Sequence, residues 1–221
     1  MNNNHANFFG LIILGILGLY GCSNQENNNN SGTKKDSSST APKEKPIKSD
    51  AAYKRPPIVQ IVDTLSPKRT VIYCKDSAAS FDRISLKLGN IYGEKLGQYI
   101  KKNKLTPTGA PMAWYKTQSA GSDGKAPYFF EAGIPVNKAG KTAVPGIRVR
   151  ELAAGKAVIA HFFGPFDLLN QGYDAIKEWM KDNKKTAAGA PYEIYLTDPI
   201  DKNGKPVDPY KIQTDIIFPV K

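Results

Sequence analysis

The sequence predicts an α+β domain made of two strand–helix–strand–strand units, with an antiparallel or mixed sheet of about eight strands and two long helices. Two observations carry this prediction. A long segment of the chain matches another segment further along, and apolar residues alternate with a period of two in some segments and three to four in others. Since the first 57 residues lack such patterning, we expect the folded domain to span residues 58–221.

The internal match has a fixed offset. Residues 99–116 (YIKKNKLTPTGAPMAWYK) align with residues 179–196 (WMKDNKKTAAGAPYEIYL) at a shift of 80, with eight of 18 positions identical. A later pair, GIPV at 133–136 and IFPV at 217–220, matches at a shift of 84. Two long copies in the same order indicate a duplicated supersecondary unit and not a solenoid of many short repeats.

The first copy begins with the β-branched segment 70–75, a predicted strand. A helix is predicted over 80–103, because its apolar residues recur every three or four positions. Strands are predicted at 111–117 and 128–136, joined by a polar loop.

The second copy repeats this order. A strand is predicted at 156–163 and a helix at 166–183, again from the spacing of apolar residues. Strands follow at 191–197 and 211–220, and the loop between them, DPIDKNGKPVDP, is rich in turn-forming residues.

The chain begins with an export signal. Residues 8–21 (FFGLIILGILGLYG) form an apolar run that is too short for a comfortable membrane span and typical of a signal-peptide core. The sequence Leu19-Tyr20-Gly21-Cys22 resembles the lipobox of bacterial lipoproteins, in which the cysteine is acylated. We therefore expect residues 1–21 to be a cleaved signal peptide and Cys22 to carry the lipid. The alternative is an N-terminal anchor that is never cleaved.

Residues 22–57 are polar, charged and proline-containing, which predicts a disordered tether. The domain would then lie in the cell envelope, outside the cytoplasm, held on a membrane surface by its lipid. The other cysteine, Cys74, lies in a predicted strand and is expected to be buried.

The net charge of +11 predicts a solvated basic surface, with attraction to anionic lipid heads as a second interpretation. Nucleic acid is not an expected partner, because the sequence contains no helix-turn-helix or RNA-binding motif. No metal site or cofactor is predicted, since histidine and cysteine residues do not cluster.

Four segments together resemble the GyrI-like domain, also called the AraC effector-binding or bacterial transcription-activator effector-binding domain. They are FFEAGIPV at 129–136, HFFGPF at 161–166, APYEIYLTDP at 190–199 and IFPVK at 217–221. The resemblance implies two pseudo-symmetric units that form an aromatic groove for small molecules. It also implies an acidic residue that selects lipophilic cations, at the position of Glu193. Relatives often carry Tyr where Phe166 stands.

Strand alternation places Glu193 and Tyr195 on one face, with Tyr115 of the first copy at the symmetric position. We expect this face to point away from the helices, because the alternating residues Tyr192 and Ile194 are more apolar. Phe129 and Glu131 share a face of their own strand and would extend the site. The alternative is a purely structural Glu193, paired with a lysine or bonded to Tyr115.

These residues favour a module that binds small amphipathic molecules, and we expect them to be cationic, since ring faces and a partly buried carboxylate both attract a cation. We expect binding in preference to turnover. One alternative is a hydrolase of small electrophiles with Glu193 as general base, as some GyrI-like proteins imply. A second is SOUL-like haem binding through His161, and a third is a purely structural lipoprotein.

Overall fold

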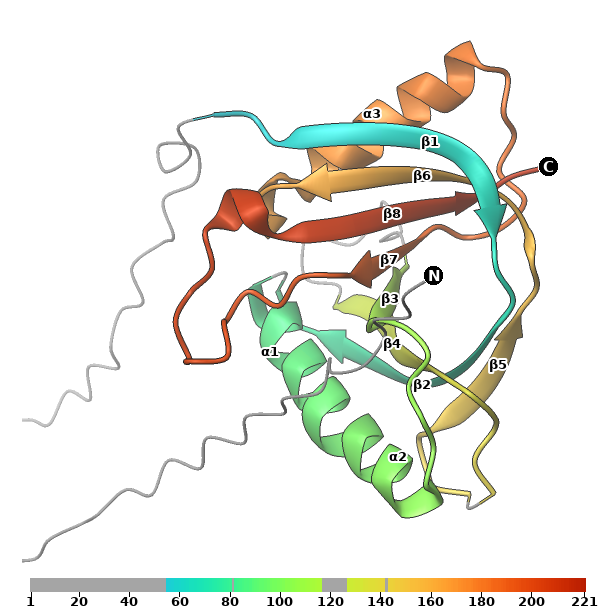
Figure 1. The fold of residues 1–221 in the computed structure, drawn as a ribbon, viewed down its shortest axis with the longest axis vertical. Coiled ribbons are helices and arrows are strands. Elements are labelled where there is room, and N and C mark those ends of the chain that lie inside the picture. The colour runs from blue at the N-terminus through green and yellow to red at the C-terminus, as the bar shows by residue number, and fades with distance from the viewer. Residues whose placement is uncertain (1–54, 81, 117–126, 142) are drawn as a thin grey trace, which may run out of the picture. The chain divides into compact units, whose positions relative to one another are not determined.

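The computed structural model describes residues 55–80, 82–116, 127–141 and 143–221, and within them it has an eight-stranded sheet with helices on one face (Figure 1). The strands are β1 (Ile58–Ser66), β2 (Arg69–Ala78), β3 (Met112–Tyr115), β4 (Tyr128–Val136), β5 (Arg148–Leu152), β6 (Gly155–Phe163), β7 (Tyr192–Tyr195) and β8 (Gln213–Pro219). The helical segments are α1 (Asp82–Asn90), the π-helix η1 (Ile91–Leu96), α2 (Gly97–Asn103), the 3₁₀ turn η2 (Phe166–Leu168), α3 (Leu169–Asp182) and the 3₁₀ turn η3 (Pro209–Lys211). None of these helices is long and apolar enough to cross a membrane.

The duplicated α+β fold is confirmed. All six predicted strands are present, and both predicted helices lie within one or two residues of their expected positions. The first helix is continuous but passes through the π-helical turn η1, which the sequence did not predict. β1 and β5 were not predicted individually. Both lie at edges of the sheet and alternate exposed with half-buried residues, so they lack the apolar runs of the inner strands.

The strand order is β1-β6-β8-β7-β3-β4-β2-β5, and the neighbouring strands pair antiparallel. The two repeats meet at the centre, where β7 of the second pairs with β3 of the first. The edge strands are exchanged between the repeats. β1 precedes the first repeat but pairs with β6 of the second, and β5 precedes the second repeat but pairs with β2 of the first.

The sheet is strongly curved. Two residues, Pro67 and Lys68, join β1 at one edge to β2 beside the other edge, and such a link spans only about 10 Å. The end of β1 must therefore curl toward β2, as Figure 1 shows. On the inner side of this curve the Ser66 hydroxyl lies 3.2 Å from the Tyr192 hydroxyl of β7. The sheet thus has an outer face, which the helices cover, and an inner face that closes partly on itself.

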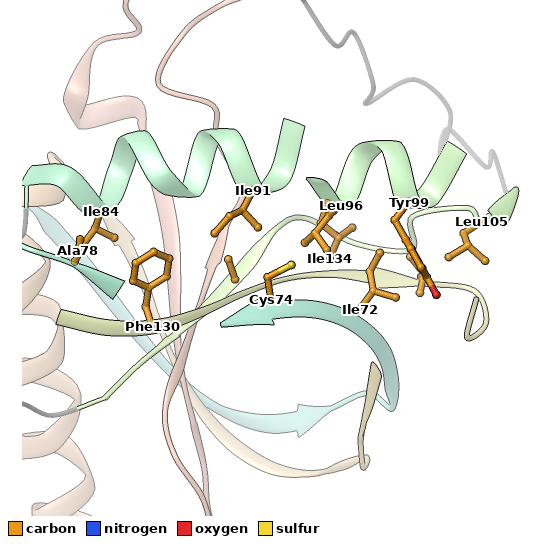
Figure 2. Close-up of a cluster of buried hydrophobic side chains, with 12 residues drawn as sticks. Ile72, Cys74, Ala78, Ile84, Ile91, Leu96, Tyr99, Leu105, Phe130 and Ile134 are labelled. Atoms are coloured by element: carbon orange, nitrogen blue, oxygen red, sulfur yellow. The ribbon is translucent and has the colours of Figure 1, made fainter. Parts of the chain in front are cut away.

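Two separate clusters of apolar side chains pack on the outer face. The α1–η1–α2 segment packs on the first repeat, with Leu96 and Ile72 fully buried (Figure 2). Helix α3 packs on the second repeat, with Ile176 against Phe162 in its core. The central strands β3 and β7 lie between these two clusters.

A third cluster fills the inner face. Its buried members come from five strands, and Trp114 stacks near Tyr192 with ring centroids 5.5 Å apart. The inner face of the central strands is therefore apolar and buried. The members are Val71, Met112, Trp114, Ala157, Tyr192, Ile194 and Ile217.

Candidate functional site

A carboxylate and four tyrosines meet on the outer face, above the junction of the two repeats. β3 and β7 pair here over only two positions, Met112 with Ile194 and Ala113 with Glu193. The side chain of Glu193 therefore lies beside the pseudo-axis of the duplication, opposite an alanine. This short pairing places the Glu193 carboxylate between the two helical segments.

Glu193 is only 4% exposed, and tyrosine hydroxyls are its hydrogen-bond partners. The Tyr173 hydroxyl of α3 donates to Oε1 at 2.9 Å, and the Tyr195 hydroxyl donates to Oε2 at 2.8 Å. The Tyr115 hydroxyl lies 2.6 Å from that of Tyr195 and extends the network into the first repeat. Among the described residues, no lysine or arginine neutralises this carboxylate.

Two further rings complete the surroundings of the carboxylate. The ring of Tyr92 lies 6.3 Å from that of Tyr195, and Phe166 meets Tyr195 edge-on at 6.0 Å. Tyr92, Tyr115, Tyr173, Tyr195 and Phe166 are all half-buried, so the rings keep some access to solvent while the carboxylate beneath them does not.

The π-helix positions Tyr92. Asn103 and Asn183, which end the two helices, are 80 residues apart, whereas Tyr92 and Tyr173 are 81 apart. A π-helical turn holds one residue more than an α-helical turn, so η1 absorbs this extra residue. The turn thereby brings Tyr92 to the position in the first repeat that Tyr173 occupies in the second.

Burial raises the pKa of Glu193 to about 7, against the hydrogen bonds of Tyr195 and Tyr173, which lower it. Burial, and then the nearby Glu193 charge, raise the pKa of Tyr115 and of Tyr173 above the ordinary value. The tyrosines therefore stay protonated as donors near neutral pH, while Glu193 changes charge there.

The predicted orientation of Glu193 is wrong. Glu193 and Tyr195 point toward the helices, and Tyr192 and Ile194 point into the inner cluster. The prediction took the more apolar side of the strand as the helix side, but the curved sheet buries an apolar cluster on its inner face too. Apolar character therefore does not distinguish the two faces of this strand.

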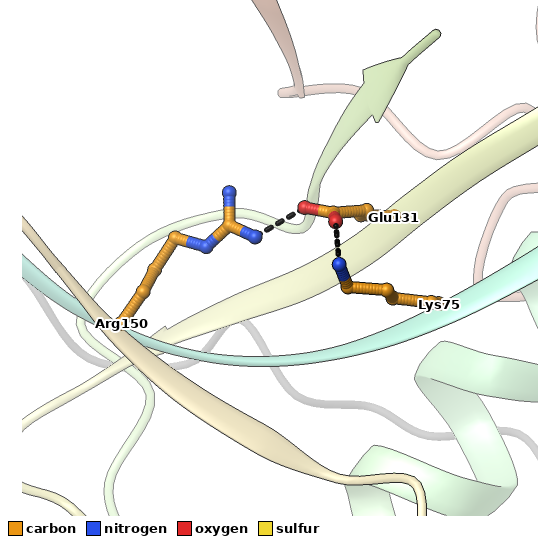
Figure 3. Close-up of polar contacts among 3 residues, drawn as sticks. All are labelled: Lys75, Glu131 and Arg150. Atoms are coloured by element: carbon orange, nitrogen blue, oxygen red, sulfur yellow. Dashed lines mark hydrogen bonds and ion pairs between the residues drawn. The ribbon is translucent and has the colours of Figure 1, made fainter.

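The structure brings Glu193, Tyr195, Tyr115 and Phe166 together, but not Phe129 and Glu131. Phe129 is 52% exposed, and Glu131 lies in register with Trp114 on the inner face. Glu131 forms ion pairs with Lys75, at 3.0 Å, and with Arg150 (Figure 3).

These two cations decide the charge of Glu131. Burial raises its pKa, but the hydrogen bonds and charges of Lys75 and Arg150 outweigh burial and hold the pKa below the ordinary value. The Arg150 guanidinium also lies 3.9 Å from the centre of the Tyr73 ring and 4.7 Å from that of Trp114. Glu131 is thus part of a packed ionic cluster.

Sequence reasoning missed Tyr173, Tyr92 and Thr214. Tyr173 lies in the helix predicted at 166–183, where the spacing of apolar residues indicates a packed face and no binding role. Thr214 pairs with Tyr195 across β7 and β8, and its buried hydroxyl has no hydrogen-bond partner among the described residues. The available signal was the alignment of the repeats, which places a tyrosine of each helix near the central strands.

His161 lies on the inner face, with Nδ1 2.7 Å from Asp215 Oδ1.

Cys74 is fully buried and free, as expected. Cys22 lies outside the described residues. Within the described ranges no three metal-binding side chains gather. A hollow of about 500 Å³ lies beside η1, and none of the site tyrosines lines it. Its lining residues are Asp76, Lys87, Asn90, Ile91, Glu94, Lys95 and Gln98.

Two duplicated units with a buried carboxylate and tyrosines at their junction define a small-molecule-binding module. The chain belongs to the family described as the GyrI-like small molecule binding domain, whose model matches residues 79–221. No curated protein matches the chain.

Solved structures show the same fold. The chain is similar to the EcmrR C-terminal domain, with 24% identity and a TM-score of 0.58, over 74% of this chain and 98% of that one. The chain is also similar to EcmrR in a DNA complex, with 24% identity and a TM-score of 0.59. The match covers 74% of this chain but only 57% of the EcmrR chain. An uncharacterized conserved protein from Listeria innocua matches at 14% identity and TM-score 0.51, over 77% and 94% of the two chains.

Proposed function

We propose that this domain captures small amphipathic cations at Glu193, on the outer surface of a membrane to which Cys22 anchors it. One observation carries the choice of ligand. A buried carboxylate at the centre of the duplication has tyrosine hydroxyls as partners and no cation among the described residues. Family membership supports small-molecule binding as such.

The physical argument rests on desolvation. An ionised carboxylate in this position is costly unless a positive charge accompanies it, and its raised pKa reflects that cost. A ligand cation supplies the missing charge. The surrounding rings each attract a desolvated cation by about 0.5–2 kcal/mol and also bury its apolar part. A neutral molecule of the same shape gains only the burial.

The test compares two carboxylates in one fold. Binding of a lipophilic cation such as benzyltrimethylammonium is measured by calorimetry at pH 8 on wild type, Glu193→Gln and Glu131→Gln. We expect Glu193→Gln to weaken binding at least about tenfold, because it removes the attraction between two opposite charges in a desolvated site, and Glu131→Gln to leave it within about twofold. Equal affinities for wild type and Glu193→Gln would overturn the assigned site.

The anchor is proposed from the sequence. The apolar run at 8–21 ends at Cys22, and a polar segment of the length needed to hold the domain off a surface follows it. The charge of +11 supports attraction to anionic lipid heads.

The anchor is tested by labelling cells with an alkyne fatty acid. Wild type should incorporate the label, and Cys22→Ala should not. Cys74→Ala is the matched control, because its thiol is buried in the folded domain. Label on Cys22→Ala, or none on wild type, contradicts lipidation at Cys22. Membrane retention of an unlabelled wild-type chain would indicate the uncleaved anchor.

A second candidate is a hydrolase that uses the same residues. A carboxylate with a pKa of about 7 beside protonated tyrosines has the properties of a general base near neutral pH. Turnover of an electrophilic ester or cyclopropane substrate, lost in Glu193→Gln, would favour it over capture alone.

A further inference from the structure

The two repeats contribute different chemistry to the shared site. Matching positions of the sheet pair Glu193 in the second repeat with Ala113 in the first, and Thr214 with Phe130. In each pair the polar residue belongs to the second repeat. Tyr115 and Tyr195 match each other and touch at the pseudo-axis. The site is therefore symmetric in its central rings and asymmetric in its polar groups.

Thr214 is an independent sign of this asymmetry. Its side chain is 1% exposed, and its hydroxyl has no hydrogen-bond partner in the described part of the chain. It shares the outer face with Tyr195, its direct cross-strand neighbour, which places their Cβ atoms about 5 Å apart. A buried hydroxyl without a partner is unfavourable, so a group that bonds it gains more than an ordinary surface contact.

Among its described residues, the first repeat offers no buried hydroxyl without a hydrogen-bond partner. The Tyr92 hydroxyl donates to the carbonyl oxygen of Met112 at 2.9 Å, so its donor is already used. Phe130 is buried and apolar, with its ring 6.4 Å from that of Tyr115. The first repeat therefore offers a ligand mainly the apolar surface of aromatic rings and of the Ala113 methyl group.

We propose that the site holds its ligand in one orientation, with a cationic N–H-bearing head over the second repeat, near Glu193 and Thr214, and an apolar end over the first, against Tyr92 and Ala113. This rests on the proposed function and narrows the ligand class. The preferred ligand is a protonated primary or secondary amine at one end of an apolar body.

Two related classes are disfavoured. A quaternary ammonium carries the charge but no N–H, so it cannot donate to the Thr214 hydroxyl or to the carboxylate. A dication with charge at both ends must desolvate its second charge against Ala113 and Phe130, where the carboxylate of Asp76, across the strands from Phe130, is already paired with Lys87. A single charge at one end avoids both losses.

Three probes with the same aromatic body separate these cases on the intact domain: 4-ethylbenzylamine, its trimethylammonium counterpart, and p-xylylenediamine, in which an ammonium replaces the terminal methyl. We expect 4-ethylbenzylamine to bind about fivefold more tightly than the trimethylammonium, because it forms a hydrogen bond that the trimethylammonium cannot form. It should bind about tenfold more tightly than the dication, because the dication must desolvate a second charge. Equal affinity of all three would overturn the proposal.

Substitutions at Thr214 and Tyr92 test where the cationic head of the ligand lies. Thr214→Val, of similar shape, should weaken 4-ethylbenzylamine about fivefold and leave the trimethylammonium within twofold, and Thr214→Ser should retain amine binding. Tyr92→Leu should weaken both ligands alike, since it removes ring surface that both use. If Thr214→Val weakens neither ligand, or both equally, the hydroxyl does not contact the head.

Failure of this proposal is distinguishable from failure of the proposed function. If Glu193→Gln weakens both monocations but Thr214→Val changes neither, cation capture stands and the orientation is wrong. If Glu193→Gln changes neither ligand, the site itself is wrong. Circular dichroism and thermal unfolding on each variant confirm that the fold is retained.

Discussion

Two carboxylates, Glu131 and Glu193, are buried on adjacent regions of the same sheet, but their surroundings differ. Glu131 on the inner face has Lys75 and Arg150, and its pKa is lowered. Glu193 on the outer face has two tyrosine hydroxyls, and its pKa is raised to about 7. Burial alone therefore does not identify a binding site. Our proposal of a site at Glu193 rests in addition on the absence of a counter-ion among the described residues.

The two positions should also respond differently to substitution. At Glu131 the native partners stabilise the charged form, so removing either side of the cluster costs stability. At Glu193 the charged form opposes folding, so removing the charge should add stability and remove binding. The predictions below start with the largest effect.

Arg150→Met should cost about 3 kcal/mol of unfolding free energy, because it leaves a largely buried Glu131 with only Lys75 and removes contacts to Tyr73 and Trp114. Urea denaturation at pH 7 measures this. Lys68→Met is the matched control, since its ion pair with Glu151 is exposed to solvent and should contribute little to stability. Equal costs for the two variants would contradict a special role for the Arg150 cluster.

Glu193→Gln should raise the unfolding free energy by about 2 kcal/mol at pH 8 and by little at pH 5. The folded-state pKa lies near 7 and the ordinary value is 4.5, so the folded protein holds a proton that the unfolded chain releases between these values. Wild-type stability from this group is therefore full below about 4.5 and is lost as the pH rises to about 7. A pH-independent difference between the two proteins would show that Glu193 keeps an ordinary pKa.

Cation affinity should fall as the pH drops below 7, about fivefold between pH 7 and pH 6 and approaching about tenfold per pH unit below that, because binding needs ionised Glu193. Above pH 8 the affinity should level off. Titrations in buffers of different ionisation enthalpy would detect the released proton at pH 6. An affinity that stays flat from pH 6 to pH 8 excludes this coupling.

Thr214→Val should raise the unfolding free energy of the ligand-free protein by about 1 kcal/mol, since a methyl group replaces a buried hydroxyl that lacks a partner among the described residues. The midpoint of thermal unfolding measures this. A clear fall in that midpoint would mean that the hydroxyl is hydrogen-bonded in solution.

Much of the fold could be predicted because local patterns and the repeat agree. The segment TVIYCK shows strand periodicity and YIKKNKL shows helix periodicity. The internal match at an offset of 80 residues indicates that the same elements occur again near Lys156 and Trp179. The edge strands were harder, because exposed strands need no apolar alternation. The π-helical turn was not visible until Tyr92 and Tyr173 could be compared in space.

The candidate site was only partly predictable. Glu193, Tyr195 and Tyr115 follow from strand alternation and the duplication, but their direction depends on which face the helices cover. Glu131 was grouped with them because it shares a face of its own strand with Phe129. Only the positions of Lys75 and Arg150, on strands remote in sequence, separate the two carboxylates. Long-range pairing of this kind is not encoded in any single segment.

The exchange of β1 and β5 has a consequence for cutting the chain. A break in the segment between Val136 and Arg148 leaves each fragment with one strand that pairs only with the other fragment. Neither fragment could complete its sheet alone, whereas a mixture of the two would restore every strand pair. The duplicated halves are therefore interlocked partners, and one half expressed by itself would expose an unpaired strand edge and tend to associate with a second copy.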